Sequence, residues 1–188
     1  MKTQKIVIWC LRILMAAAVV LKLVLGQYGL AAYGTVAVAL TFLPELARLL
    51  FHWEIPMEFR TILTVFVFLA MTVAKLFYLY EITNWWDKFL HCCSGVILAY
   101  VGVTIGRRLT RGENRLIILL FGLAFAIACA AVWEIWEFSG DALFGLDSQR
   151  RATGVVDTMG DIIAGTIGAC VTIPFLKKIA DGKQNPDA

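Results

Sequence analysis

The chain has 188 residues, of which 60% are hydrophobic and only 16% carry a charge, and its mean hydropathy is +0.78. Soluble domains contain about 45–50% apolar residues, so these few charged side chains could not cover the surface of a soluble protein. The formal net charge is +3, and the basic residues form no stripe outside short loops, which argues against binding to nucleic acid. The composition therefore indicates an integral membrane protein.

Six apolar segments are each long enough to cross a bilayer, which requires about 20 mostly apolar residues in a helix. The sequence therefore predicts an all-α polytopic membrane protein, with six transmembrane helices in one bundle and a single domain over residues 1–188. The polar residues 179–188 are expected to form a cytoplasmic tail. The predicted spans are approximately residues 6–25, 28–50, 59–80, 86–105, 116–138 and 155–176.

Polar residues interrupt the first two spans. Two lysines precede the first apolar stretch, as in a signal peptide, but Arg12 lies inside that stretch and no good cleavage site follows it. We therefore expect the first span to be a retained membrane anchor. Pro44 and Glu45 interrupt the second span, so we expect it to end near Leu43 and to continue as an interfacial helix through Phe51.

The distribution of basic residues predicts the orientation of the helices through the positive-inside rule. With the N-terminus in the cytoplasm, eleven Lys and Arg residues fall on the cytoplasmic side, whereas only Arg150 and Arg151 fall in the outer loops. Both termini are therefore expected in the cytoplasm. The cytoplasmic set comprises Lys2, Lys5, Arg48, Arg60, Arg107, Arg108, Arg111, Arg115, Lys177, Lys178 and Lys183.

Three pairs of acidic or histidine residues lie in the apolar segments or at their edges, each at a helical spacing of three or four residues. An ionisable group at membrane depth is costly unless it is paired, hydrated or bound to an ion. In the predicted orientation, all three pairs lie at the outer end of the bundle, on helix faces that turn toward one another. The pairs are Asp87 with His91, Glu134 with Glu137, and Asp157 with Asp161.

Five carboxylates and one imidazole form a ligand set suited to a divalent metal such as Mn, Fe, Zn or Mg. We therefore predict that all six residues are metal ligands, and that Glu134 or Asp161 acts as a general base. Without a cation, repulsion among the carboxylates would favour a protonated cluster. For Asp87 and Asp157 a simpler explanation stays open, because a carboxylate near a helix N-terminus stabilises the helix dipole.

Small residues follow the two aspartates of the last span on the same predicted helix face. Gly160, Ala164 and Gly168 recur at intervals of four residues, a pattern typical of closely packed membrane helices. Elsewhere in the chain, Lys22 and Lys75 fall in the outer halves of the first and third spans. Either lysine could supply a counter-charge to the acidic cluster.

The loop over residues 139–154 joins the two most acidic spans, so we expect it to lie over the cluster as a lid. Gln149 and Arg150 lie in this loop. An arginine beside an acidic metal site could recognise a phosphate or carboxylate group, so both residues are candidates for binding a substrate.

Three stretches of the chain agree in residue type and spacing with a known family. They are residues 85–95 (Trp-Trp-Asp-Lys-Phe-Leu-His-Cys-Cys-Ser-Gly), residues 133–138 (Trp-Glu-Ile-Trp-Glu-Phe) followed by Gln149 and Arg150, and residues 157–161 (Asp-Thr-Met-Gly-Asp). Together they resemble the YjdF-like bacterial membrane-spanning proteins and, more distantly, VanZ-like proteins. The resemblance covers about residues 41–169 and implies a bacterial inner-membrane protein, but it supplies no reaction.

The sequence leaves three functions open. A metal-dependent hydrolase or transferase would act on a lipid or lipid-linked substrate at the outer leaflet. A proton- or cation-coupled transporter would use the carboxylates as a relay, although the inner halves of the last three spans continue the polar path only with Thr104, Thr166 and Thr172. A structural or regulatory membrane protein would use the metal to hold three helices together. Membrane lipids are expected partners in each case, and the oligomeric state is not determined by the sequence.

Overall fold

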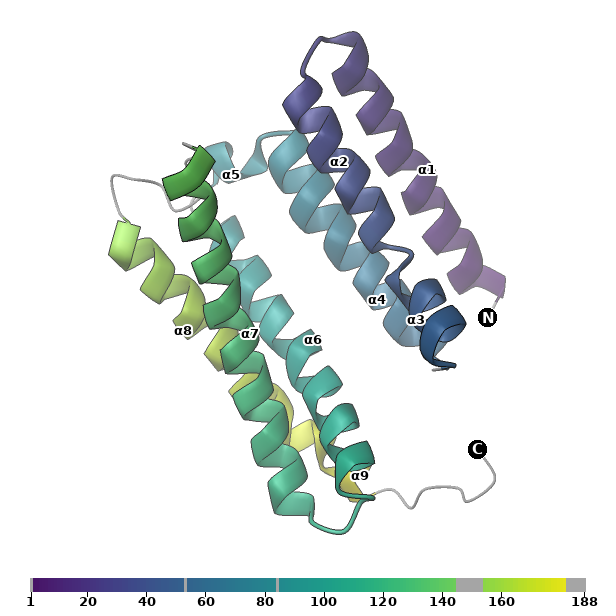
Figure 1. Cartoon of the computed structure of the whole chain (residues 1–188), viewed down its shortest axis with the longest axis vertical. Coiled ribbons are helices and arrows are strands. Elements are labelled where there is room, and N and C mark those ends of the chain that lie inside the picture. The colour runs from purple at the N-terminus through teal and green to yellow at the C-terminus, as the bar shows by residue number, and fades with distance from the viewer. Residues whose placement is uncertain (1, 53, 84, 145–153, 182–188) are drawn as a thin grey trace. The chain divides into compact units, whose positions relative to one another are not determined.

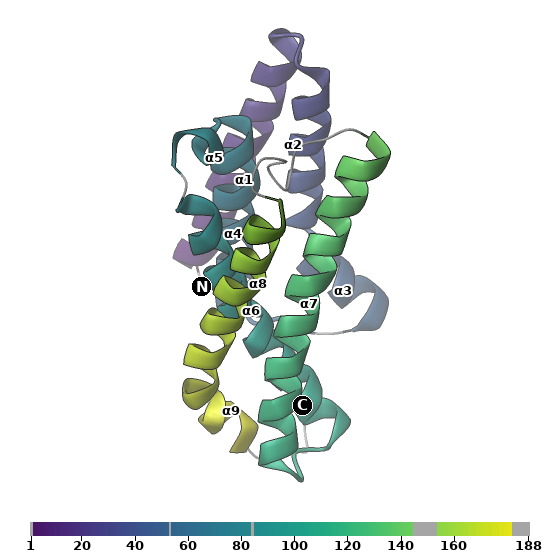
Figure 2. The same cartoon turned by 90° about the vertical axis from the view of Figure 1, so that its left-hand side faces the viewer.

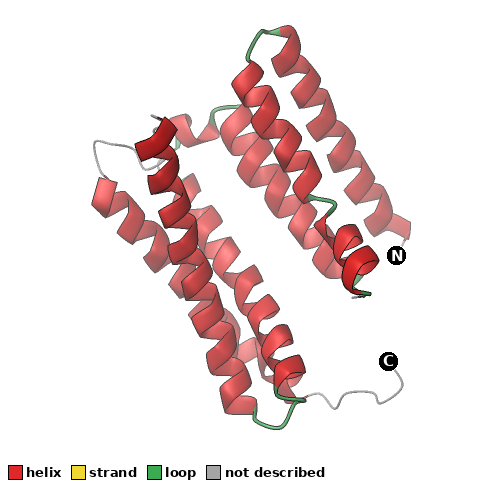
Figure 3. Ribbon diagram, in the orientation of Figure 1, coloured by secondary structure: helices red, strands yellow, loops and turns green. Residues whose placement is uncertain are grey.

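The computed structural model describes residues 2–52, 54–83, 85–144 and 154–181. Figure 3 shows that the regular structure over these residues is helical, with no strand among them, which confirms the all-α prediction. The chain forms two compact units, Met1–Trp86 and Asp87–Ala188. The expectation of a single domain stays a prediction.

The first unit is built around a long N-terminal helix. This helix, α1 (Lys2–Val24), packs against α2 (Tyr28–Leu40) and α4 (Met57–Val67), as Figure 1 shows. A π-helix, η1 (Phe68–Leu76), continues α4 and packs against α2. The short helix α5 (Leu79–Ile82) follows η1. A cluster of buried apolar side chains in this unit consists of Met15, Ala37, Val67 and Met71.

The second apolar segment is broken, as its sequence predicts. The helix α2 ends at Leu40, and α3 (Leu43–Phe51) follows at an angle of 48° to it. Pro44 lies at the start of α3, where a proline is tolerated because the first backbone N–H groups of a helix have no partner within it. The predicted break therefore falls at the proline.

The second unit is a bundle of three long helices, of which the middle one runs antiparallel to the other two, seen from two sides in Figures 1 and 2. These are α6 (Trp86–Leu109), α7 (Arg115–Phe144) and α8 (Gly154–Thr172). A short 3₁₀-helix, η2 (Ile173–Leu176), and α9 (Lys177–Asp181) continue α8 and pack against α7. The buried apolar core consists of Ala99, Val103, Ile118, Leu119, Ala126, Ala169, Leu176 and Ala180.

Glycines allow α6 and α8 to pack with their backbones in contact. A Cβ atom added to Gly95 would overlap the backbone carbonyl of Gly165, and one added to Gly168 would overlap that of Cys92. Such close approach is how membrane helices gain packing energy where lipid tails are as apolar as the side chains. The register of α6 against α8 is therefore set by these four residues.

Five helical segments are long and apolar enough to cross a membrane, and the bent α2–α3 pair would be a sixth. Large apolar side chains such as Val156 and Phe175 are exposed, as expected for surfaces that face lipid. Among the ends of the observed helices, that of α7 differs most from the predicted span, because α7 continues to Phe144 instead of ending near residue 138. Within this extension the Ser139 hydroxyl donates to the Ile135 carbonyl, so a polar residue is accommodated without ending the helix.

Replacing Gly95 by alanine should destabilise the protein, because the added methyl group would force α6 and α8 apart. We expect a loss of about 1–3 kcal/mol in the free energy of unfolding, typical of an overpacked core. Thermal unfolding of the purified full-length protein in detergent would measure the change. Gly29→Ala is the matched control, because a Cβ at Gly29 meets no atom within 4 Å. Equal stability of the two variants would contradict the proposed packing.

Candidate functional site

The three acidic pairs lie at one end of the second unit, because α6 and α8 begin where α7 ends (Figure 1). Each pair lies within the last or first turns of its helix at that end. The helix α6 contributes Asp87 and His91, α7 contributes Glu134 and Glu137, and α8 contributes Asp157 and Asp161.

His91 lies among carboxylates from all three helices. Its Nε2 atom is 3.7 Å from Asp87 Oδ1, 3.7 Å from Asp161 Oδ1 and 3.9 Å from Glu134 Oε1. Asp87, His91 and Asp161 each offer one ligand atom, and these three atoms all lie within 4.8 Å of one another. Two atoms that each lie about 2 Å from one ion, the bond length that zinc forms with nitrogen and oxygen ligands, are at most about 4 Å apart. The spacing of His91 from each of the two aspartates is within that limit, so these residues form a candidate site for a divalent cation.

Lys88 joins α6 to α8 through two aspartates. Its Nζ atom lies 2.7 Å from Asp157 Oδ1 and 2.8 Å from Asp161 Oδ1, and it also donates to the backbone carbonyl of Asp157 at 3.2 Å. Gly160 leaves room for this side chain, since a Cβ there would lie 3.0 Å from Lys88 Cε. The lysine therefore partly neutralises the cluster without a metal.

Sequence analysis did not identify Lys88 as a member of the site. The available signal was its position directly after Asp87 and three residues before His91, which places it on the same side of the helix. A lysine at a helix end usually extends to the membrane interface. The position of Lys88 alone therefore does not show whether it extends to the interface or binds the acidic cluster.

Negative charge exceeds positive charge in the cluster. Asp161 is 2% exposed and Glu134 is 4% exposed, so neither carboxylate has full access to water. The three pairs contribute five carboxylates, whereas Lys88 is the one lysine or arginine that the described ion pairs place among them. Burial of unbalanced charge is unfavourable, and a bound cation or bound protons would relieve it.

Glu137 lies at the edge of the cluster. It is close enough to Glu134 and Asp161 to interact with them electrostatically, and its Oε1 atom accepts a hydrogen bond of 2.9 Å from Trp133 Nε1. Trp133 is half exposed, as expected for a tryptophan at a membrane interface. Glu137 therefore lies beside the cluster and is hydrogen-bonded to a tryptophan of its own helix.

The packed face of α8 differs by one residue from the predicted face. Gly165, rather than Ala164, is buried between the helices, where an added Cβ would lie 3.5 Å from the carbonyl oxygen of His91 and 3.4 Å from Ala130 Cβ. This contact lies one turn below Asp161, so it fixes the depth of the carboxylate relative to the imidazole.

The expected lid and substrate residues lie partly outside the described residues. Residues 139–144 belong to α7, and Gln149 and Arg150 fall in the range 145–153, which the structure does not describe. Their role in substrate binding stays a prediction. Of the two expected counter-charges, Lys22 is buried in the first unit with its ammonium group 4.7 Å from the Tyr78 ring, and Lys75 is exposed.

Comparison with known proteins identifies a family but no activity. The family model described as "Predicted membrane protein (DUF2238)" matches residues 6–182. A protein of Thermotoga maritima named "Uncharacterized protein" is 28% identical over 133 residues, which cover 70% of this chain and 68% of that protein. No solved structure matches the chain. The likeness to YjdF-like proteins is compatible with this family and stays a resemblance. The chain therefore belongs to the DUF2238 family of predicted membrane proteins, with an all-helical structure typical of a multi-pass membrane protein.

Proposed function

We propose that the second unit binds a divalent metal ion and acts as a hydrolase or transferase on a lipid or lipid-linked substrate. The observation that carries the proposal is the convergence of Asp87, His91 and Asp161, whose ligand atoms all lie within 4.8 Å of one another. Glu134 approaches the same imidazole from α7. Mn, Fe, Zn and Mg are the candidate metals, because mixed carboxylate and imidazole ligands suit hard or borderline cations.

A bound metal would polarise a phosphoryl or carbonyl oxygen and acidify a water molecule. Glu134 is the better of the two candidate general bases, because Asp161 is already bound to Lys88 and is therefore better suited as a ligand. Asp157 is held by the same lysine and would position it. Glu137, at the edge of the cluster, would be a further ligand or would orient the substrate.

Two observations favour an enzyme over the alternatives. A proton- or cation-coupled transporter needs a polar path through the bundle, but α6 and α8 are in backbone contact at Gly95 and Gly168, directly below the cluster. A metal that only staples the helices would duplicate the link that Lys88 already makes between α6 and α8. Neither observation requires a particular substrate.

The proposed location is the bacterial inner membrane, with both termini in the cytoplasm and the cluster at the outer face. The charge bias of the loops supports this orientation, because eleven basic residues fall on one side. A substrate would then reach the site from the outer leaflet, beside the segment that carries Gln149 and Arg150.

This orientation predicts that a reporter enzyme active only in the cytoplasm will be active when fused after the C-terminus. The same reporter placed between Glu113 and Asn114 should also be active, because these residues lie between α6 and α7 at the end of the unit opposite the cluster. Activity only from a reporter that requires export would reverse the proposed orientation.

Substitutions at two positions of the cluster should affect metal content and catalytic activity differently. Dialysed wild-type protein should retain about one equivalent of divalent metal per chain, and Asp161→Asn should lose most of it because a ligand is removed. Glu134→Gln should keep the metal but lower turnover by about 10²–10⁴-fold, the usual contribution of a general base. Mass spectrometry of the metal, together with product release from a panel of lipid phosphates and lipid esters, would measure both.

Glu113→Gln is the matched control for this experiment, because Glu113 is an exposed carboxylate in the loop between α6 and α7. It should keep metal and activity. Absence of metal from wild-type protein, even after incubation with each candidate ion, would contradict the metal site. Metal without turnover of any tested substrate would favour the structural role instead.

Lys88→Met should have opposite effects on stability and on metal affinity. Removing the ammonium group leaves Asp157 and the buried Asp161 without their cation. Because Lys88 is about one third exposed and partly screened by solvent, we expect a cost of about 1–3 kcal/mol. The metal-free variant should therefore unfold at a lower temperature than the wild type. Metal should bind more tightly and raise that temperature by a larger amount, because no lysine competes for the carboxylates. An equal metal-induced shift in both proteins would show that Lys88 and the metal use separate groups.

A further inference from the structure

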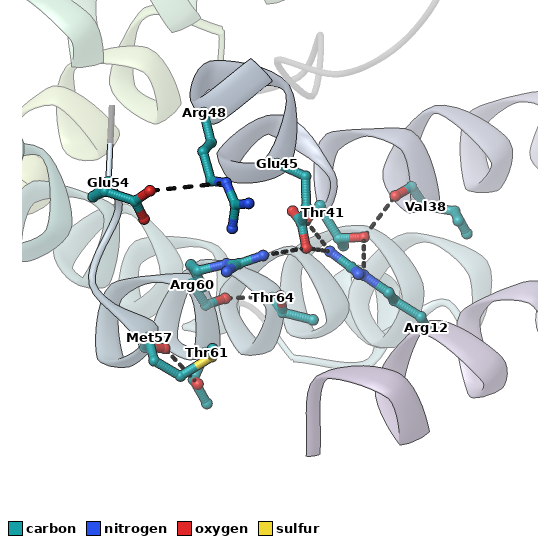
Figure 4. Close-up of polar contacts among 10 residues, drawn as sticks. All are labelled: Arg12, Val38, Thr41, Glu45, Arg48, Glu54, Met57, Arg60, Thr61 and Thr64. Carbon is teal, nitrogen blue, oxygen red and sulfur yellow. Dashed lines mark hydrogen bonds and ion pairs between the residues drawn. The ribbon is translucent and has the colours of Figure 1, made fainter. Parts of the chain in front are cut away.

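A second polar network lies in the first unit, where α3 meets α1 and α4 (Figure 4). Glu45 is at its centre. Its Oε1 atom accepts a hydrogen bond from Arg12 Nη2 at 3.0 Å and lies 2.6 Å from Arg60 Nη2. The charge of this carboxylate is thus balanced by two arginines from two other helices, and α3 is held at a fixed position beside them.

Arg12 also fixes the turn that precedes α3. Its Nε atom donates to Thr41 Oγ1 at 3.1 Å, and its Nη2 atom donates to the Thr41 carbonyl at 2.6 Å. The guanidinium carbon lies 3.7 Å from the centre of the Phe42 ring, in a cation–π contact. These contacts are to α1, to α3 and to the residues between α2 and α3, so Arg12 has a structural role.

Arg48 and Arg60 have hydrogen-bonding groups that this network does not use. Figure 4 shows the Arg48 guanidinium directed toward that of Arg60. Arg48 Nε is 3.8 Å from Glu54 Oε1, too far for a hydrogen bond, and both side chains are largely exposed. Arg60 Nε is buried and has no hydrogen-bond partner among the described residues. Donors from two arginines therefore face a common space.

This space is a recess of about 400 Å³ lined by Glu45, Arg48, Leu49 and Arg60. Besides the unused donors, it offers one acceptor, because Glu45 Oε2 is buried without a hydrogen-bond partner in the described part of the chain. Two guanidinium groups that approach one another repel unless an anion lies between them. A phosphate that also carries a hydroxyl group would satisfy both the arginines and Glu45 Oε2.

The side chains around the recess favour a ligand at a membrane surface. On α3, the apolar side chains of Leu46, Leu50 and Phe51 are exposed, while Glu45 is held in the polar network and Arg48 is a largely exposed cation. A short helix with this division lies in the interface, with its apolar side toward acyl chains and its basic side at the level of the headgroups.

We propose that the recess between Arg48 and Arg60 binds a phosphate group that carries a hydroxyl, in the form of an anionic phospholipid headgroup or of free hydrogen phosphate. Arginine is suited to this role because its planar fork donates two parallel hydrogen bonds to phosphate oxygens. The site is separate from the acidic cluster and does not depend on the function proposed for it.

Native mass spectrometry of the full-length protein in detergent tests the proposal with phosphatidylglycerol as the probe. Wild-type protein should retain one phosphatidylglycerol in preference to a diacylglycerol with the same chains, which lacks the phosphate. Arg48→Gln should weaken phosphatidylglycerol binding about tenfold, the effect of losing roughly one charge-assisted hydrogen bond. Arg48→Lys should recover only part of the affinity, because it restores the charge without the fork.

Lys178→Gln is the matched control, because it removes one exposed positive charge far along the sequence from the recess and should bind phosphatidylglycerol as the wild type does. Inorganic phosphate distinguishes the two sources. Displacement of the lipid by millimolar phosphate, with loss of phosphate binding in Arg48→Gln, would identify free phosphate as a ligand, whereas retention of the lipid would identify the headgroup. Equal lipid binding by wild type and Arg48→Gln, or equal binding of diacylglycerol and phosphatidylglycerol, would overturn the proposal.

Discussion

The ion pairs between Lys88 and the aspartates of α8 are the interaction on which the acidic end of the second unit depends. Carboxylates buried in an apolar bundle need a cation close by, and this lysine reaches Asp157 and Asp161 from the neighbouring helix. The link brings the start of α8 against the start of α6, and so brings Asp161 to His91. Glu134, which is almost fully buried, approaches His91 from α7. One lysine thus joins α6 to α8 beside a histidine that faces carboxylates from all three helices.

The glycine contacts below the cluster determine how its carboxylates can be used. Because α6 and α8 meet backbone to backbone at Gly95 and Gly168, the polar groups are confined to one end of the bundle. A confined group of carboxylates beside an imidazole can hold an ion and exchange protons with a substrate that approaches from that end. It is poorly arranged to pass an ion onward. The chemistry of the site and the packing beneath it therefore both favour a site that is reached from one end over a path that conducts ions through the bundle.

Length and hydropathy were sufficient to predict the helices, because a bilayer requires long apolar segments and few other structures satisfy it. The alternating direction of the last three spans likewise predicted that the three acidic pairs share one end. The contribution of Lys88 was not predictable, since the direction of its side chain depends on the space that Gly160 leaves on another helix. Sequence spacing also predicted Ala164 on the packed face of α8, where the structure buries Gly165 instead. The difference arises because the crossing of α8 with α6 sets the register between them. The metal ligation of all six predicted residues, and the roles of Gln149 and Arg150, stay predictions.

Arg12 has a consequence for how the chain enters the membrane. It lies in the middle of the first apolar helix, yet its partners, Thr41 and Glu45, are contributed by residues that emerge from the ribosome later. An isolated first helix would leave this guanidinium without its partners in an apolar segment, at a cost below the ~2.5–3.5 kcal/mol of an arginine at the bilayer centre. The helix α1 is therefore most stable in lipid after α2 and α3 have been synthesised. We expect the insertion machinery to release α1 into the membrane together with them.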